Sequence, residues 1–278
     1  MINKKKKKIN IGLQVLRKRP DGFHDIDTWM IPVPFYDILE CRVHSASSTP
    51  FHFTQSGITV DEPLSAHLCY RAFEAFSRSV PCPPVRLHLH KQIPVGAGLG
   101  GGSSNGAATL KALNKITGNP LSAVQLEELA ATLGSDCPLF IHNVPMLASG
   151  RGERLEKREI DLSNRYLVLL HPRFAISTAE AYKLVRPGDR RPALESLIKQ
   201  PVNEWKTIIV NDFEAPLFRH YPLLKELKDG LYNSGALYAS MSGSGSSVYG
   251  IFDTEPDLPE DLTRYMIWNG FPGKAEIR

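Results

Sequence analysis

Hydrophobic and polar positions alternate along several short stretches of the chain, which is the pattern of half-buried β-strands. The clearest stretch is residues 85–90, where Val, Leu and Leu alternate with Arg and two His. A turn rich in Arg, Pro, Asp and Gly follows the first strand at residues 17–22. The predicted strands are residues 9–16, 28–33, 38–43, 85–90, 166–170, 236–239 and 247–252.

Apolar residues spaced three and four apart predict helices elsewhere. The predicted helices cover residues 66–76, 107–116, 122–133, 194–199 and 223–232. The third begins with a capping box, Ser122 to Gln125, and ends before Gly134. Because strands and helices do not alternate regularly, the predicted fold class is α+β. A length of 278 residues favours two domains, which we expect at residues 1–157 and 158–278.

Composition narrows the class of protein. With 42% hydrophobic and 22% charged residues, the chain can bury a core, which excludes a disordered protein. No stretch approaches 18 uncharged apolar residues, so no membrane-spanning helix is expected. The four cysteines form no CxxC pair and are typical of reduced thiols rather than a zinc site or disulfides. We therefore expect a cytoplasmic protein.

The net charge of +4 depends on one segment, because Lys4 to Lys8 are five consecutive lysines. Without them the rest of the chain carries a net charge of −1. Such a run can bind nucleic acid or a membrane surface, or can be a solvated end of the chain. Since the remaining surface is not basic, we expect neither a nucleic-acid nor a membrane partner.

A glycine-rich segment between the strand at 85–90 and the helix at 107–116 is the most informative part of the sequence. Its five glycines let the backbone approach a ligand, and a helix N-terminus that follows attracts anions. Two serine hydroxyls at its end can bind phosphate oxygen or Mg²⁺. The predicted phosphate-binding residues are Pro94, Val95, Gly96, Ala97, Gly98, Leu99, Gly100, Gly101, Gly102, Ser103 and Ser104.

Other nucleotide motifs fit this segment less well. Residues 96–101 satisfy GxGxxG, but no strand ending in Asp or Glu follows about 20 residues later, as a dinucleotide fold requires. No lysine precedes the serine pair, which excludes a P-loop. The HRD and DFG sequences of protein kinases are absent. A flexible glycine turn explains some of the glycines but not the serine pair at a helix start.

Residues 94–104 resemble the phosphate-binding motif of the GHMP kinases. Residues 8–13 and 240–247 resemble the N-terminal and C-terminal motifs of the same family, in the same order. The resemblance implies a ribosomal-S5-like N-terminal domain and a ferredoxin-like C-terminal domain. It also implies ATP as phosphoryl donor and Mg²⁺ held by Ser104 or its neighbour Ser103. It implies no oligomeric state.

Three further segments, residues 19–24, 133–138 and 211–214, resemble one branch of this family. The acceptor of that branch is a cytidine-diphosphate-linked methylerythritol, phosphorylated on its 2-hydroxyl. The resemblance makes Asp136 the catalytic base and Lys8 the cation beside it. The residues that it assigns to substrate binding are Asn10, Phe23 and His24.

Each assignment has a plainer alternative. Asp136 can cap the following turn. Lys8 can be the last of five solvated lysines. Before the position of Lys8 the family usually has small or apolar residues, whereas this chain has Lys5 to Lys7. His88 and His90 share one strand face, but a solvated face is favoured over a metal pair. For the whole chain, the alternatives are a GHMP kinase acting on homoserine or a mevalonate-type acceptor, and a non-catalytic nucleic-acid binder.

Overall fold

The computed structural model describes residues 2–45, 48–188 and 192–273, and these form two compact units. Unit 1 takes in the described residues within Met1–Lys7, Pro34–Val95 and Gly100–Asn143. Unit 2 takes in those within Lys8–Val33, Gly96–Leu99 and Val144–Arg278. Two long paired strands, β1 (Ile2–Lys18) and β2 (His24–Val43), run through both units. The units are therefore not consecutive pieces of the chain.

In unit 1, β4 (Val85–Lys91) pairs with two strands. It runs antiparallel to the second part of β2, with Ile38 opposite His90, and parallel to β3 (Phe51–Gly57). Alternate residues of β4 are buried, as its sequence pattern predicts, and the last buried position is Lys91. The strand thus carries a charge at the end of its buried face.

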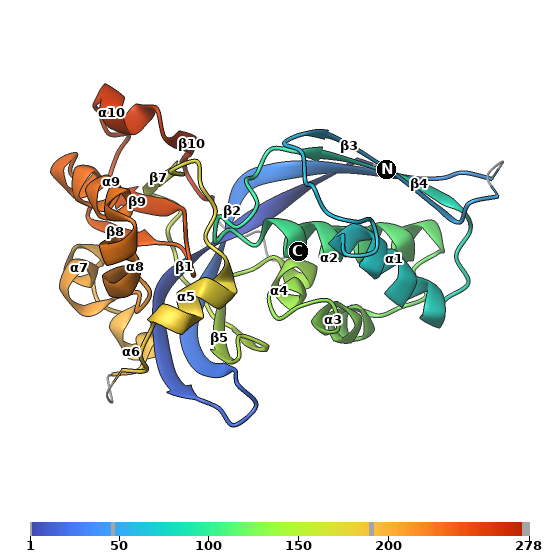
Figure 1. Cartoon of the computed structure of the whole chain (residues 1–278), viewed down its shortest axis with the longest axis horizontal. Helices are drawn as coiled ribbons and strands as arrows, with labels where there is room; N and C mark the ends of the chain where they lie inside the picture. The colour runs from blue at the N-terminus through green and yellow to red at the C-terminus, as the bar shows by residue number, and fades with distance from the viewer. Residues whose placement is uncertain (1, 46–47, 189–191, 274–278) are drawn as a thin grey trace. The chain divides into compact units, whose positions relative to one another are not determined.

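Four helices lie along one face of β3 and β4 in unit 1 (Figure 1). They are α1 (Leu68–Ser79), α2 (Gly101–Ile116), α3 (Ala123–Ala131) and α4 (Cys137–His142). The capping box at Ser122 and Gln125 is present at the start of α3, which confirms that prediction. Nearly every residue of α2 from Ser104 to Asn114 is buried, so this helix is the centre of the unit.

Unit 2 contains a four-stranded antiparallel sheet in the order β10-β7-β9-β8. Its strands are β7 (Tyr166–Leu170), β8 (Tyr238–Met241), β9 (Val248–Phe252) and β10 (Met266–Gly270). Helices separate β7 from β8 and β9 from β10, which gives the β-α-β-β-α-β arrangement of ferredoxin-like domains. The first part of β2 also lies in this unit and pairs with β5 (Met146–Gly150), which pairs with β6 (Arg154–Lys157).

The helices of unit 2 are short apart from α9, which lies against β8 and β9 (Figure 1). They are α5 (Thr178–Leu184), α6 (Leu194–Leu197), η1 (Val202–Glu204), α7 (Trp205–Ile208), α8 (Glu214–His220), α9 (Pro222–Asn233) and α10 (Glu260–Thr263). The core between sheet and helices includes Val168, Phe213, Leu224 and Met241. No helix within the described ranges is long and apolar enough to cross a membrane.

Some predicted boundaries are wrong. The strands expected at 28–33 and 38–43 form the single strand β2, although Pro32 and Pro34 lie between them. These prolines fall between the part of β2 that pairs with β5, up to Met30, and the part that pairs with β4, from Ile38. A proline there removes no hydrogen bond to β4 or β5. The helix expected at 107–116 begins six residues earlier, at Gly101.

Candidate active site

The first turn of α2 is built from the glycine-rich segment. Gly100 is the N-cap residue in the left-handed conformation, and no side chain caps the helix. The first intrahelical bond is donated by the Ser104 N–H to the Gly100 carbonyl, at 2.9 Å. The N–H groups of Gly101, Gly102 and Ser103 therefore have no partner within the helix. Such a turn is a site for an anion, and Gly102 is exposed.

The preceding glycines belong to unit 2 and have backbone conformations that a side chain would prevent. Gly96 and Gly98 have φ of 65° and 73°. A Cβ atom on Gly98 would collide with the carbonyl oxygen of Ser242, and one on Gly96 would lie 2.8 Å from the Cβ of Ala175. Glycine is thus needed here for close backbone packing as well as for conformation.

The two serines of the motif differ in their surroundings. Ser104 is 1% exposed, and its hydroxyl donates a hydrogen bond of 2.9 Å to the carbonyl oxygen of Lys6. Ser103 is half-buried, and a side-chain hydrogen bond joins it to the thiol of Cys137. Of the two hydroxyls, that of Ser103 is the more accessible. Across the described residues, no group of three or more His, Cys, Asp or Glu could hold a metal ion.

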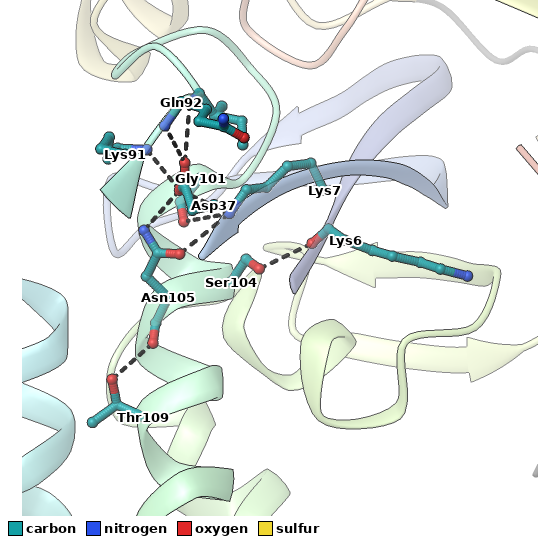
Figure 2. Close-up of polar contacts among 10 residues, drawn as sticks. Lys6, Lys7, Asp37, Lys91, Gln92, Gly101, Ser104, Asn105 and Thr109 are labelled. Atoms are coloured by element: carbon teal, nitrogen blue, oxygen red, sulfur yellow. Dashed lines mark hydrogen bonds and ion pairs between the residues drawn. The ribbon is translucent and has the colours of Figure 1, made fainter. Parts of the chain in front are cut away.

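A buried charge cluster lies against this turn of α2 (Figure 2). Asp37, which is fully buried, forms ion pairs of 3.0 Å with Lys7 and 2.9 Å with Lys91. Burial alone would raise the pKa of Asp37, but the two ammonium groups hold it far below its usual range. Asn105 donates a hydrogen bond of 2.9 Å to the same carboxylate oxygen. Lys7 is therefore not part of a solvated terminus.

Asp136 occupies the N-cap position of α4 in unit 1, but its side chain makes no capping hydrogen bond. The carboxylate therefore does not cap α4, contrary to the plainer alternative. Asp136 is half-buried, and the next residue, Cys137, is the partner of Ser103. Unit 1 thus brings the predicted base close to the first turn of α2.

Lys8 lies in unit 2 and is 4% exposed, so it is not a solvated lysine. Its ammonium group donates hydrogen bonds of 2.5 Å to Oδ1 of Asn10 and 2.9 Å to the carbonyl oxygen of Gly98. The amide of Asn10 donates in turn to Thr28, at 3.0 Å. Asn10 is 2% exposed, so its position suits orientation of Lys8 better than direct contact with a substrate.

The C-terminal glycine motif packs against these residues within unit 2. The hydroxyl of Ser242 donates to the Gly98 carbonyl at 3.0 Å and accepts the backbone N–H of Asn10 at 3.2 Å. Asn211 donates from Nδ2 to the carbonyl oxygens of Met241 and Gly243, both at 2.8 Å. The Asn211 segment, one of the three that resemble the family branch, therefore holds the glycine motif in place.

His24 and Phe23 follow the turn between β1 and β2. The ring of His24 stacks on Tyr182 of α5, with centroids 4.9 Å apart and planes 21° apart. Burial, together with nearby Lys18, lowers the pKa of His24. Phe23 is 55% exposed, and the Arg151 guanidinium lies 4.8 Å from its ring centroid. The sequence did not indicate that Tyr182 packs on His24, because nothing in a short helix marks one aromatic residue as the partner of a distant ring.

The sequence also missed the partners of the charge cluster. The signals available were Lys91 at the end of an alternating buried face and Asp37 as a charged residue next to a predicted strand. His88 and His90 are bridged by the hydroxyl of Ser56, at 3.0 Å from each ring, which fits the expected polar strand face.

Comparison with known proteins identifies the class. The family model for the GHMP kinases N terminal domain matches residues 67–144, and that for the GHMP kinases C terminal domain matches residues 193–265. The chain is thus a GHMP kinase, and the predicted α+β class with two family domains is confirmed. The two matched stretches lie on either side of the predicted domain boundary between residues 157 and 158. The exact boundary stays a prediction.

Closer relatives narrow the family. Curated 4-diphosphocytidyl-2-C-methyl-D-erythritol kinases from Parabacteroides distasonis and Cytophaga hutchinsonii are both 44% identical, covering 95% of this chain and 96% of each relative. A crystal structure of 4-(cytidine 5'-diphospho)-2C-methyl-D-erythritol kinase is 32% identical, with a TM-score of 0.80 over 98% of this chain and 99% of that one. The chain belongs to the 4-diphosphocytidyl-2-C-methyl-D-erythritol kinase family of small-molecule kinases. GHMP kinases use ATP as phosphate donor.

Proposed function

We propose that this kinase transfers the γ-phosphoryl group of ATP to the 2-hydroxyl of 4-diphosphocytidyl-2-C-methyl-D-erythritol, a step of non-mevalonate isoprenoid biosynthesis. The observation that carries the choice of acceptor is the 44% identity, over 95% of the chain, to a curated kinase with that name. The stacked pair of His24 and Tyr182 supports it, because a pyrimidine base binds well against aromatic rings.

The residues from Pro94 to Ser104 bind the ATP phosphates in this proposal. The N–H groups of Gly101, Gly102 and Ser103 donate to phosphate oxygens, aided by the dipole of α2. The Ser103 hydroxyl, which is less buried than that of Ser104, would provide the protein oxygen for Mg²⁺. Kinase Mg²⁺ is held mainly by phosphates and one or two protein oxygens, and it neutralises charge on the transferring group.

Asp136 accepts the proton of the 2-hydroxyl as the new bond forms. Lys8 stabilises the negative charge that develops on this oxygen, and the contacts of its ammonium group with Asn10 and Gly98 fix its direction. Phosphoryl transfer needs little covalent chemistry from the protein, so positioning and charge account for most of the catalysis. Asn10 then acts through Lys8 rather than on the substrate.

The cytosine of the acceptor binds at His24, Tyr182 and Phe23. The lowered pKa of His24 keeps its imidazole neutral at neutral pH, so one ring nitrogen accepts and the other donates a hydrogen bond. Such a neutral ring can read the amide-like edge of cytosine. We further propose action in the cytoplasm, which four cysteines without a disulfide support. The substrates are small molecules, and no nucleic-acid or membrane partner is proposed.

The direct test is ADP release by the purified chain with Mg·ATP, with and without the cytidine compound. Homoserine and mevalonate serve as alternative acceptors. ADP formation that depends on the cytidine compound is the expected result. Stimulation by homoserine or mevalonate but not by the cytidine compound would contradict the proposed acceptor while leaving the kinase assignment intact.

Asp136→Asn tests the proposed base. We expect turnover to fall by about 10²–10⁴-fold, the usual contribution of a general base, with nucleotide affinity within twofold of the unmodified chain. Glu128→Gln, an exposed carboxylate on the neighbouring helix α3, is the matched control. Turnover of Asp136→Asn within tenfold of the unmodified kinase would show that another group takes the proton.

A further inference from the structure

Unit 1 contains more buried positive than negative charge next to the phosphate-binding turn (Figure 2). Lys7 and Lys91 are 0% and 3% exposed, and both pair with the single carboxylate of Asp37. Among the described residues, the ionisable groups that act on Lys7 are Asp37, Lys91 and Cys69 of α1. Burial raises the pKa of Cys69 to about 12, so this thiol is neutral. With both lysines protonated, the cluster has one excess positive charge.

The excess charge lies at an unfavourable end of α2. The ammonium group of Lys7 is 3.4 Å from the carbonyl oxygen of Gly101 and 3.3 Å from Oδ1 of Asn105. A Cβ atom on Gly101 would lie only 3.2 Å from Nζ of Lys91. Helix N-termini have partial positive charge, so cations are disfavoured there and anions are favoured. Two buried cations at this position therefore destabilise the unliganded protein.

Lys91 and Asp37 alone would be a balanced pair. Asp37 is one position beyond the Ile38–His90 pair of β2 and β4, so it faces Lys91 across the two strands. Lys7 is the additional charge, and its four-carbon side chain is buried where an apolar residue of similar size would satisfy packing. A buried ion that is not fully compensated costs stability unless a ligand compensates it. The N–H groups of the same turn that have no partner within the helix can donate to such a ligand, an anion.

We propose that Lys7 is a positioning residue for the nucleotide polyphosphate, which neutralises the excess charge of the Lys7–Asp37–Lys91 cluster when it binds at the first turn of α2. The inference rests on the assignment of this turn to the ATP phosphates. Lys7 holds the turn by its contacts with Gly101 and Asn105. Its positive charge also attracts the phosphate groups. It does not reach the reacting atoms.

The protonation of Lys7 gives this role a pH dependence. Burial lowers the pKa of Lys7 to about 8, Lys91 acts in the same direction, and Asp37 opposes the change. The positive charge is therefore present below about pH 8 and is lost as the pH rises through that value. Bound phosphate favours the charged form, so nucleotide affinity falls as pH rises from 7.5 to 9.

The test compares binding of the Mg²⁺ complex of a non-hydrolysable ATP analogue, by calorimetry, to the full chain and to Lys7→Met. Lys115→Met at the other end of α2 removes the same charge from an exposed position and is the control. At pH 7.5 we expect Lys7→Met to bind about tenfold more weakly and to lose the decline in affinity between pH 7.5 and 9. Its melting temperature without ligand should equal or exceed that of the unmodified chain. In turnover, the KM for ATP rises while kcat stays within twofold.

Lys7→Gln is the second neutral variant; it keeps a donor for the Gly101 carbonyl but removes the charge, so it serves if the methionine variant folds poorly. Equal affinity in the Lys7 variants and the unmodified chain overturns this inference alone. A lower melting temperature with an unchanged pH profile also overturns it, because that result describes a purely structural lysine. Absence of nucleotide binding by the unmodified chain overturns both this inference and the phosphate-site assignment.

Discussion

Asp37→Asn should strongly destabilise unit 1, because Asp37 is fully buried and accepts five hydrogen bonds and ion-pair contacts. Oδ1 of Asp37 accepts the backbone N–H groups of Gln92 and Ile93 at 2.8 and 3.0 Å. An asparagine oxygen can keep both of these bonds. The other oxygen would become an NH₂ group facing three donors, the ammonium groups of Lys7 and Lys91 and the amide of Asn105. The substitution therefore replaces an acceptor by a donor and leaves two buried cations without a counter-charge.

Removal of one partner from a buried ion pair typically costs about 3–5 kcal/mol. Here one of the two cations has an escape, because Lys7 can lose its proton at a cost of about 1.4 kcal/mol per pH unit below its pKa. We therefore expect a loss of about 3–4 kcal/mol at pH 7, against a total stability of roughly 5–15 kcal/mol for a folded domain. The double variant Asp37→Asn/Lys7→Met, which removes one unpaired cation, should recover about half of this loss.

Urea unfolding measures both effects. Asp229→Asn is the matched control, because Asp229 forms an exposed ion pair with Lys225 and should contribute less than about 1 kcal/mol. A loss below 1 kcal/mol for Asp37→Asn, or a double variant no more stable than the single one, would refute the reasoning. The folded-state pKa of Asp37 is far below the unfolded value of about 3.9, so its contribution is present above pH 4 and declines at more acid pH. Asp37→Asn should lack this decline.

Two further substitutions test the nucleotide and acceptor ends of the proposal. Gly98→Ala should weaken nucleotide binding at least tenfold and lower the melting temperature, because the added Cβ would collide with the Ser242 carbonyl oxygen. Gly118→Ala is the control: Gly118 has a φ of 87° but no atom near a Cβ, so this substitution costs only the left-handed backbone strain, about 1–2 kcal/mol. Equal effects of the two substitutions on binding would contradict this. Tyr182→Leu should raise the KM for the cytidine compound about 2–12-fold, the value of one aromatic stack, with the KM for ATP unchanged. An increase in the KM for ATP instead would remove Tyr182 and His24 from the acceptor site.

The elements that could be predicted are those defined by residues close to one another in the chain. The capping box of α3 and the alternating strand β4 depend on residues within a few positions of one another, and both predictions are confirmed. Short helices such as α4 and α5, of six and seven residues, show too little of a period to be predicted. Strand β6 was not predicted, because three of its four residues are charged and only its pairing with β5 defines it.

Tertiary partners determined what the sequence could not give for the candidate site. Five identical lysines carry no signal of which are buried, and the ion pair that distinguishes Lys7 from Lys8 joins it to Asp37, 30 positions away in the chain. The start of α2 at Gly101 likewise depends on a tertiary contact. Glycine disfavours helices by about 1 kcal/mol, so the sequence favoured a start at Ala107, whereas contacts of Lys7 with the first turn support the earlier one.

In unit 2, the conformation of Lys8 is determined before any substrate binds. A lysine side chain has about 2 kcal/mol of rotamer entropy to lose, and a kinase that ordered it during the reaction would add this cost to the barrier. Here Asn10 and the Gly98 carbonyl hold the ammonium group, while Ser242 fixes both of those residues. Asn211 in turn fixes the glycine motif that contains Ser242. The cost of ordering Lys8 is therefore incurred during folding, through buried hydrogen bonds that link Lys8 and Asn10 to Gly98 and to the C-terminal glycine motif within unit 2.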